Sequence, residues 1–132
     1  MQLDQARRAR PKDDCVKNIL VVDDDLELRQ VLVNTLTDVD HIVLAAADGF
    51  EAIRILTEHH VDLLIADVRM PGIDGFELAR QAKVMRPLLH VIYISGYDFD
   101  KEKRAGRILG PILPKPLRSD DLRFRVRYEL SL

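Results

Sequence analysis

Short apolar runs alternate along most of the chain with segments whose apolar residues recur at helical spacing. The runs occupy residues 18–22 (NILVV), 41–45 (HIVLA), 61–66 (VDLLIA) and 90–94 (HVIYI), with a minimal fifth run at 112–113. Aliphatic and β-branched runs of this length, without regular polar alternation, are typical of strands buried on both faces of a sheet. We therefore predict five strands.

The intervening segments carry apolar residues three and four positions apart, which is the spacing of a helix face. The faces consist of Leu28, Val31, Leu32 and Leu36, then Ala52, Ile53 and Leu56, then Leu78, Ala82 and Met85 within residues 76–85. Asp48-Gly49 marks the entry to the second of these helices. A weakly patterned helix is also expected somewhere in residues 99–109.

The last segment fits two patterns. Leu122, Val126 and Leu130 share one helix face, and Ser119 stands where an N-cap is expected. Residues 123–128 (RFRVRY) also alternate with period two, as a strand would. We favour the helix, because it completes the alternation of strands and helices.

This alternation predicts an α/β fold with a parallel sheet covered on both sides. In such sheets, ligands bind outside the carboxyl ends of the strands. The polar residues after the predicted strands are Asp23, Asp24 and Asp25 after the first, Asp67 after the third, Ser95 after the fourth and Lys115 after the fifth. A parallel sheet would gather these residues at one edge.

These residue types suit phosphoryl chemistry. Two carboxylates about 4 Å apart repel by roughly 4 kcal/mol at an effective dielectric near 20, so three of them need a cation or a proton. Carboxylates without Cys or His favour Mg²⁺ over zinc. With such an ion present, one carboxylate can attack phosphorus and form an aspartyl phosphate. Lys115 would offset charge on the phosphoryl oxygens, and the Ser95 hydroxyl would donate a hydrogen bond to one of them.

The sequence resembles the receiver domains of two-component response regulators. The matching segments are ILVVDDDLELR (19–29), DLLIADVRMPGIDGFEL (62–78), VIYISGY (91–97) and LPKPL (113–117), in the family's order and at near-family spacing over residues 18–130. The resemblance implies a doubly wound, five-stranded parallel sheet of the flavodoxin-like (βα)5 type. It also implies Mg²⁺-dependent phosphoryl transfer from a histidine kinase or a histidine phosphotransfer protein.

The resemblance implies a metal site as well. Asp24 would bind Mg²⁺ directly, Asp23 directly or through water, and Arg69 through its backbone carbonyl. The phosphoacceptor Asp67 would complete the ligand set. Asp25 is better explained as a helix cap, since Asp is favoured at that position.

In the same way, Ser95 would be the switch hydroxyl and Lys115 would contact the phosphoryl group, with a cis Lys115-Pro116 peptide. Such a domain is a phosphoacceptor rather than a separate enzyme, although it promotes its own phosphorylation and dephosphorylation. A surface of the fourth helix, fifth strand and fifth helix is the family's common output face.

Three positions depart from the family pattern. Ile112 stands where many receivers carry Tyr or Phe, whose rotation reports phosphorylation. Gly96 stands where the family often has Ala. The third position is Arg69, two residues after the acceptor. Signalling would then depend on the loop from Ser95 to Tyr97 and on the helix after it.

Composition narrows the setting. The chain has 132 residues, 47% of them hydrophobic, which fits one domain at residues 18–132. Residues 1–17 are expected to form a basic, solvated tail, and the alternative is that this tail is a docking arm. A net charge of −2, with no apolar run of about 20 residues, favours neither nucleic acid nor membrane. The single cysteine, Cys15, agrees with a cytoplasmic location. We expect an unidentified downstream protein partner, and homodimer formation on phosphorylation remains open.

Other functions remain as alternatives. A pseudo-receiver would share the fold and bind a partner without phosphorylation. An aspartyl-phosphate hydrolase usually has a second Asp two residues after its nucleophile, where this chain has Arg69. Nucleic-acid binding would rest on the tail and on Arg118, Arg123, Arg125 and Arg127, which are interleaved with acidic residues. The sequence leaves open whether the receiver stands alone or comes from a hybrid kinase.

Overall fold

The computed structural model describes residues 16–37, 40–96 and 105–132, and five strands within them form one parallel sheet. The strands are β1 (Asn18–Val22), β2 (Ile42–Ala46), β3 (Leu63–Asp67), β4 (His90–Ser95) and β5 (Ile112–Pro114). Their order is β2-β1-β3-β4-β5, so the chain reverses direction across the sheet after β2. This confirms the predicted doubly wound α/β fold.

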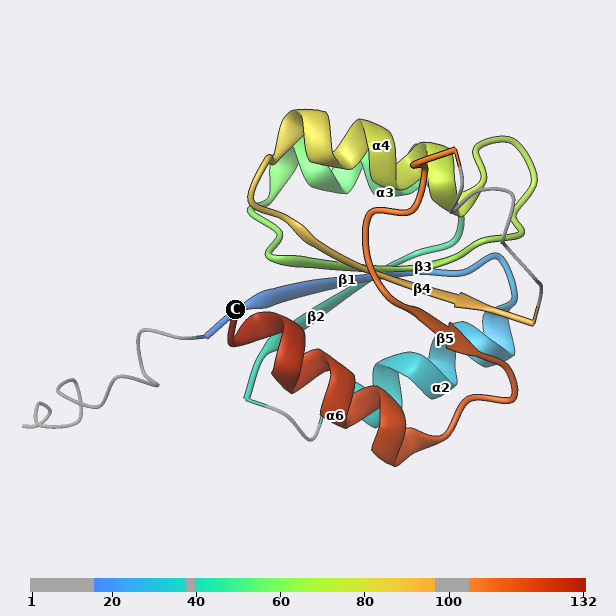
Figure 1. Cartoon of the computed structure of the whole chain (residues 1–132), viewed down its shortest axis with the longest axis vertical. Helices are drawn as coiled ribbons and strands as arrows, with labels where there is room; N and C mark the ends of the chain where they lie inside the picture. The colour runs from blue at the N-terminus through green and yellow to red at the C-terminus, as the bar shows by residue number, and fades with distance from the viewer. Residues whose placement is uncertain (1–15, 38–39, 97–104) are drawn as a thin grey trace, which may run out of the picture.

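Helices cover both faces of the sheet. In Figure 1, α3 (Gly49–Glu58) and α4 (Gly75–Met85) lie on one face, and α2 (Leu26–Leu36) and α6 (Ser119–Leu130) on the other. Successive side chains of a strand point to opposite faces. Leu64 therefore packs in the cluster under α3 and α4, whereas Ile65 packs in the cluster under α2 and α6. Both residues are fully buried, which explains the unbroken apolar runs.

Aspartate side chains begin three of these helices. Asp25 accepts the backbone N–H groups of Glu27 and Leu28, as expected of a helix cap. Asp48 caps α3 and Asp74 caps α4 in the same way. A carboxylate at this position satisfies otherwise unpaired N–H groups and interacts favourably with the helix dipole.

Two expectations about helix faces and ends were wrong. Val31 is 52% exposed, because the side of α2 that faces the sheet is formed by Leu32, Leu36 and Thr35, and Val31 falls at its margin. Ser119 is the first helical residue of α6, not its cap. Arg118 occupies the cap position without a side-chain hydrogen bond, and the acidic residues of the first turn compensate through the helix dipole.

The choice of helix over strand for the last segment was correct, since Leu122 and Val126 are buried on one face of α6. The helix expected within residues 99–109 falls mainly on residues 97–104, outside those described. Residues 105–111 form a turn and irregular chain. Most of the predicted tail, including Cys15, also lies outside the described residues. None of the described helices is long and apolar enough to cross a membrane.

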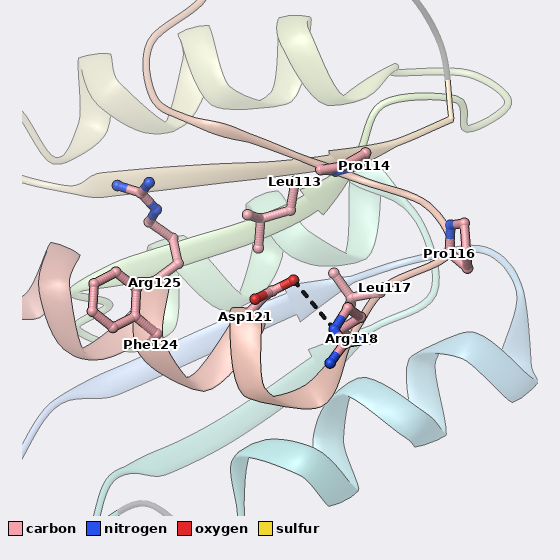
Figure 2. A pocket seen from close by; sticks show the side chains of 8 residues that line it. All are labelled: Leu113, Pro114, Pro116, Leu117, Arg118, Asp121, Phe124 and Arg125. Carbon is pink, nitrogen blue, oxygen red and sulfur yellow. Dashed lines mark ion pairs between the residues drawn. The ribbon is translucent and has the colours of Figure 1, made fainter.

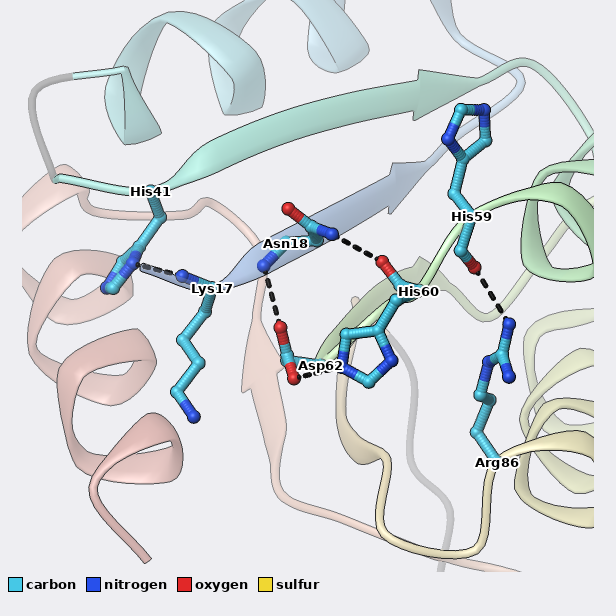
Figure 3. Close-up of polar contacts among 7 residues, drawn as sticks. All are labelled: Lys17, Asn18, His41, His59, His60, Asp62 and Arg86. Atoms are coloured by element: carbon cyan, nitrogen blue, oxygen red, sulfur yellow. Dashed lines mark hydrogen bonds and ion pairs between the residues drawn. The ribbon is translucent and has the colours of Figure 1, made fainter. Parts of the chain in front are cut away.

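At the amino ends of the strands, polar side chains pair with one another (Figure 3). Asp62 accepts the backbone N–H of Asn18 at 2.8 Å and lies 2.8 Å from His60 Nε2. His41 Nδ1 accepts the N–H of Lys17. The candidate metal group among the described residues consists of aspartates alone.

Gly75 gives the first prediction. A Cβ built at this position would lie 2.5 Å from the Asp67 backbone oxygen and 2.9 Å from Val68 Cα, neither of which can move without disturbing β3. We expect Gly75→Ala to lower the free energy of unfolding by about 1–3 kcal/mol, because the added methyl group overpacks this region. Urea denaturation measures the change. Gly96→Ala is the control, since among the described residues its Cβ would meet only Lys115 Cβ, at 3.8 Å. Equal losses in both variants would contradict the steric explanation.

Candidate functional site

Three carboxylates meet where β1 and β3 end. Asp23 and Asp24 directly follow β1, and Asp67 is the last residue of β3. The two strands are neighbours in parallel register, with Val22 opposite Ala66. One carboxylate oxygen from each aspartate lies within 4.8 Å of the other two. The convergence predicted from the strand ends is therefore present.

The two inner carboxylates are poorly solvated. Asp23 is 0% exposed and Asp67 6% exposed, whereas Asp24 lies at the surface. The pKa of Asp23 is raised to about 6, chiefly by burial; the hydrogen bond from the Asp25 N–H opposes this rise and the neighbouring Asp67 charge adds to it. Burial also raises the pKa of Asp67, against the lowering effect of Lys115 and of a backbone hydrogen bond from Arg69.

Lys115 and Ser95 complete the site. Lys115 Nζ lies 3.4 Å from Asp67 Oδ1, and the Lys115 N–H donates to the Ser95 backbone oxygen at 3.0 Å. Ser95, at the end of β4, is 4% exposed. The Lys115-Pro116 peptide is cis, as expected. The structure thus brings Asp23, Asp24, Asp67, Ser95 and Lys115 to one edge of the sheet.

The loop after Asp67 holds its carboxylate in place. The Val68 N–H donates to the Ile94 oxygen at 3.2 Å, and the Gly75 N–H donates to the Val68 oxygen at 3.0 Å. The backbone N–H of Arg69 is hydrogen-bonded to the Asp67 carboxylate. The metal-binding role expected of the Arg69 carbonyl stays a prediction. Gly72, with φ of 80°, supplies the left-handed turn that other residues rarely adopt.

Arg29 belongs to the site but was missed in the sequence. Its Nη1 donates to the Asp23 backbone oxygen at 2.8 Å, which ties α2 to the turn that carries the acidic pair. The signal was present within the segment ILVVDDDLELR, where a long basic side chain follows three acids at the start of a helix. Spacing alone does not show that such a side chain folds back onto the backbone.

The donor set fits a hard divalent cation. Asp23 Oδ1 accepts the N–H of Asp25, but Asp23 Oδ2 is buried without a hydrogen-bond partner. An unpaired buried carboxylate oxygen is costly, and a cation would relieve that cost. All three candidate ligands are carboxylates, the ligand type that Mg²⁺ prefers.

A pocket of about 290 Å³ adjoins the Lys115 end of the site (Figure 2). Pro114 and Pro116, on either side of Lys115, line it together with Phe124 and Arg125 of α6. Arg118 and Asp121 form a 3.8 Å ion pair at its rim. The pocket contains none of the carboxylates of the site, so it is a neighbouring surface rather than part of the reactive centre.

Comparison with known proteins agrees with this geometry. The sequence model of the family described as "Response regulator receiver domain" matches residues 19–127. "Response regulator MprA" of Mycobacterium ulcerans (strain Agy99) is 36% identical over 111 residues, which cover 83% of this chain and 48% of that protein. The chain therefore spans about half the length of the curated relatives it matches.

Solved structures show the same likeness. The "receiver domain from Hybrid Histidine Kinase CckA" is 38% identical with a TM-score of 0.73, covering 86% of this chain and 98% of that one. A "response regulator receiver protein from Sinorhizobium medicae WSM419" is 31% identical with a TM-score of 0.80, covering 88% of this chain and 95% of that one.

The raised pKa of Asp23 predicts how stability depends on pH without metal. The folded protein binds this proton more tightly than the unfolded chain does, so the free energy of unfolding falls as pH rises from 3.8 to about 6. Asp23→Asn removes the buried charge. We expect the free energy of unfolding of Asp23→Asn to exceed that of the wild type by roughly 1–3 kcal/mol near pH 8. Near pH 4 this difference should disappear, because the wild-type carboxyl is then protonated.

Urea unfolding in the presence of a chelator measures this difference. Adding Mg²⁺ should stabilise the wild type and leave Asp23→Asn less affected, because the cation interacts with the carboxylate that the variant lacks. A difference that stayed constant across the pH range would show that Asp23 is not the group responsible.

Proposed function

We propose that this chain, which belongs to the response regulator receiver domain family, accepts a phosphoryl group on Asp67 with Mg²⁺ as the required ion. The donor would be a phosphohistidine of a histidine kinase or of a histidine phosphotransfer protein. One observation carries the proposal. Of the three clustered carboxylates, Asp67 is the one that the described ion pairs place against an ammonium group as well as the other two acids, 3.4 Å from Lys115 Nζ.

The transfer needs no reactant besides the Asp67 carboxylate and the phosphohistidine. A carboxylate oxygen of Asp67 forms a bond to phosphorus as the P–N bond of the phosphohistidine breaks. The electron pair of that bond returns to the imidazole nitrogen. The imidazole leaves as the neutral base when its other nitrogen is protonated, and otherwise takes a proton from solvent. Asp67 must be ionised to attack, and Lys115 favours that form by lowering the pKa that burial raises.

The carboxylates of Asp23, Asp24 and Asp67 and the backbone carbonyl of Arg69 would hold the Mg²⁺. The ion supplies positive charge against the attacking carboxylate and the phosphoryl oxygens. Asp23 and Asp24 then bind and orient that charge beside the acceptor. Arg29 keeps the turn of Asp23 in place through its 2.8 Å bond to the backbone oxygen.

Lys115 and Ser95 would bind the transferred group. The Lys115 ammonium, held against Asp67 before transfer, would shift to a phosphoryl oxygen afterwards. The Ser95 hydroxyl is buried at the same edge, where it can donate a hydrogen bond to another phosphoryl oxygen. Both groups lie at this edge of the sheet before transfer.

Signalling would then proceed by protein–protein contact, in the cytoplasm, from a receiver domain spanning residues 18–132. Three arginines of the α6 segment pair with acids of the same segment: Arg118 with Asp121, Arg123 with Asp120 and Arg125 with Glu129. This pairing weakens the case for direct nucleic-acid binding. The downstream protein partner is unidentified.

Intact mass after incubation with acetyl phosphate tests the proposal. The wild type should gain one phosphoryl group only when Mg²⁺ is present, because the ion offsets the charge that opposes attack. Asp67→Asn should gain none. Asp48→Asn is the matched control, since Asn caps a helix as well as Asp does and Asp48 lies outside the cluster. It should gain the same mass as the wild type.

A folded wild type that gains no mass and forms no beryllofluoride complex would instead support the pseudo-receiver alternative. Release of many equivalents of phosphate from a phosphate ester would favour a hydrolase. An adduct that persisted in Asp67→Asn would place the acceptor elsewhere.

A further inference from the structure

Ile112 occupies the position where the family resemblance leads us to expect an aromatic residue. It is the first residue of β5 and packs, partly buried, against the cluster under α3 and α4. An isoleucine side chain has no aromatic ring, so it cannot report phosphorylation by the ring rotation expected of a Tyr or Phe at this position. A link between the acceptor site and this side of the sheet therefore needs another residue.

Tyr93 lies beside Ile112 on the neighbouring strand. The two residues are partners in the β4–β5 register, and Tyr93 is 0% exposed. Its ring packs against Phe76, with centroids 5.0 Å apart and the planes inclined at 53°. Phe76 is in the first turn of α4, which begins where the acceptor loop ends. Tyr93 thus contacts the helix that carries the loop after Asp67.

The hydroxyl of Tyr93 points to a different part of the chain. It accepts the backbone N–H of Leu109 at 3.2 Å, and the Tyr93 N–H donates to the Pro111 oxygen at 2.8 Å. A buried tyrosine hydroxyl normally has a hydrogen-bond partner, and here that partner belongs to the segment leading into β5. Burial also raises the pKa of Tyr93, so the hydroxyl stays neutral.

Ser95 lies two residues further along β4, so its side chain and that of Tyr93 share one face of the strand. A hydrogen bond from Ser95 to a phosphoryl group on Asp67 would draw this end of β4 toward β3. Tyr93 would move with it. Hydrogen bonds weaken steeply as they lengthen, so the 3.2 Å bond to Leu109 is sensitive to a small displacement.

We propose that Tyr93 is a positioning residue that couples the acceptor site to residues 105–111, with its ring following α4 through Phe76 and its hydroxyl holding the Leu109 amide. This inference rests on the proposed function of Asp67, because phosphorylation is the event that is transmitted. It assigns to a buried residue of β4 the role that a residue at position 112 cannot perform here.

Amide hydrogen exchange at Leu109, followed by NMR, tests the coupling. In the wild type, Mg²⁺ with beryllofluoride should change the Leu109 exchange rate by about tenfold or more, since exchange reports local opening. Tyr93→Phe keeps the ring against Phe76 but removes the acceptor. Its Leu109 amide should exchange quickly, with less than about a twofold difference between the two states. Tyr128→Phe, at a 47% exposed tyrosine, should behave as the wild type.

A merely structural hydroxyl would give a different result. It would protect Leu109 equally in both states of the wild type, and that outcome would overturn the proposal even if Tyr93→Phe failed to fold. A state-dependent change that survived in Tyr93→Phe would also overturn it.

Fluorine NMR separates this failure from failure of the proposed function. A bound beryllofluoride signal that is absent in Asp67→Asn shows that the acceptor site works, so an unchanged Leu109 rate then counts against Tyr93 alone. If no bound signal appears in the wild type, the result contradicts both the acceptor role of Asp67 and the coupling through Tyr93.

Discussion

The repulsion among three carboxylates at the ends of β1 and β3 is the constraint on which the site depends. The two strands are neighbours in the middle of the sheet and are buried along their length, so Asp23 and Asp67 cannot move apart without disrupting the core. Lys115, the Asp25 N–H and the Arg69 N–H offset part of the repulsion, and Asp23 Oδ2 remains unpaired. A site built in this way is unfavourable without a cation, and the proposed reactivity of Asp67 would have the same origin as this cost.

The fold and the main site residues could be predicted because both depend on local signals. A strand buried on both faces must be apolar throughout, which is why residues 18–22 and 90–94 were recognisable. Asp67, Ser95 and Lys115 stand at strand ends, so a parallel sheet alone brings them together. Boundaries were less certain. The third strand begins at Leu63 rather than Val61 and includes Asp67, because pairing with β1 and β4 decides where a strand starts and ends.

The details that failed or were missed depend on tertiary contacts. Val31 has helical spacing but lies at the margin of the face of α2 that meets the sheet, and spacing does not fix how a helix is rotated. Arg29 joins the site through a single hydrogen bond to the Asp23 backbone oxygen, and Leu109 is tied to the buried Tyr93 hydroxyl by another. No periodic pattern marks such bonds. Tyr93 appeared in the sequence only as one apolar member of a strand, because the hydrogen bond between its hydroxyl and Leu109 is a tertiary contact.

The two edges of the sheet differ in how completely their polar groups are satisfied. At the amino edge, both oxygens of Asp62 have partners, in the Asn18 N–H and in His60 (Figure 3). At the carboxyl edge, Asp23 keeps a buried oxygen without one. Folding favours the first arrangement, since each buried polar group then retains a hydrogen bond. An unsatisfied edge persists only where the surrounding structure fixes it, and an incoming cation and phosphoryl group would supply the missing partners. The same backbone thus gives the sheet one edge whose polar groups are paired and one that keeps a buried carboxylate oxygen unpaired.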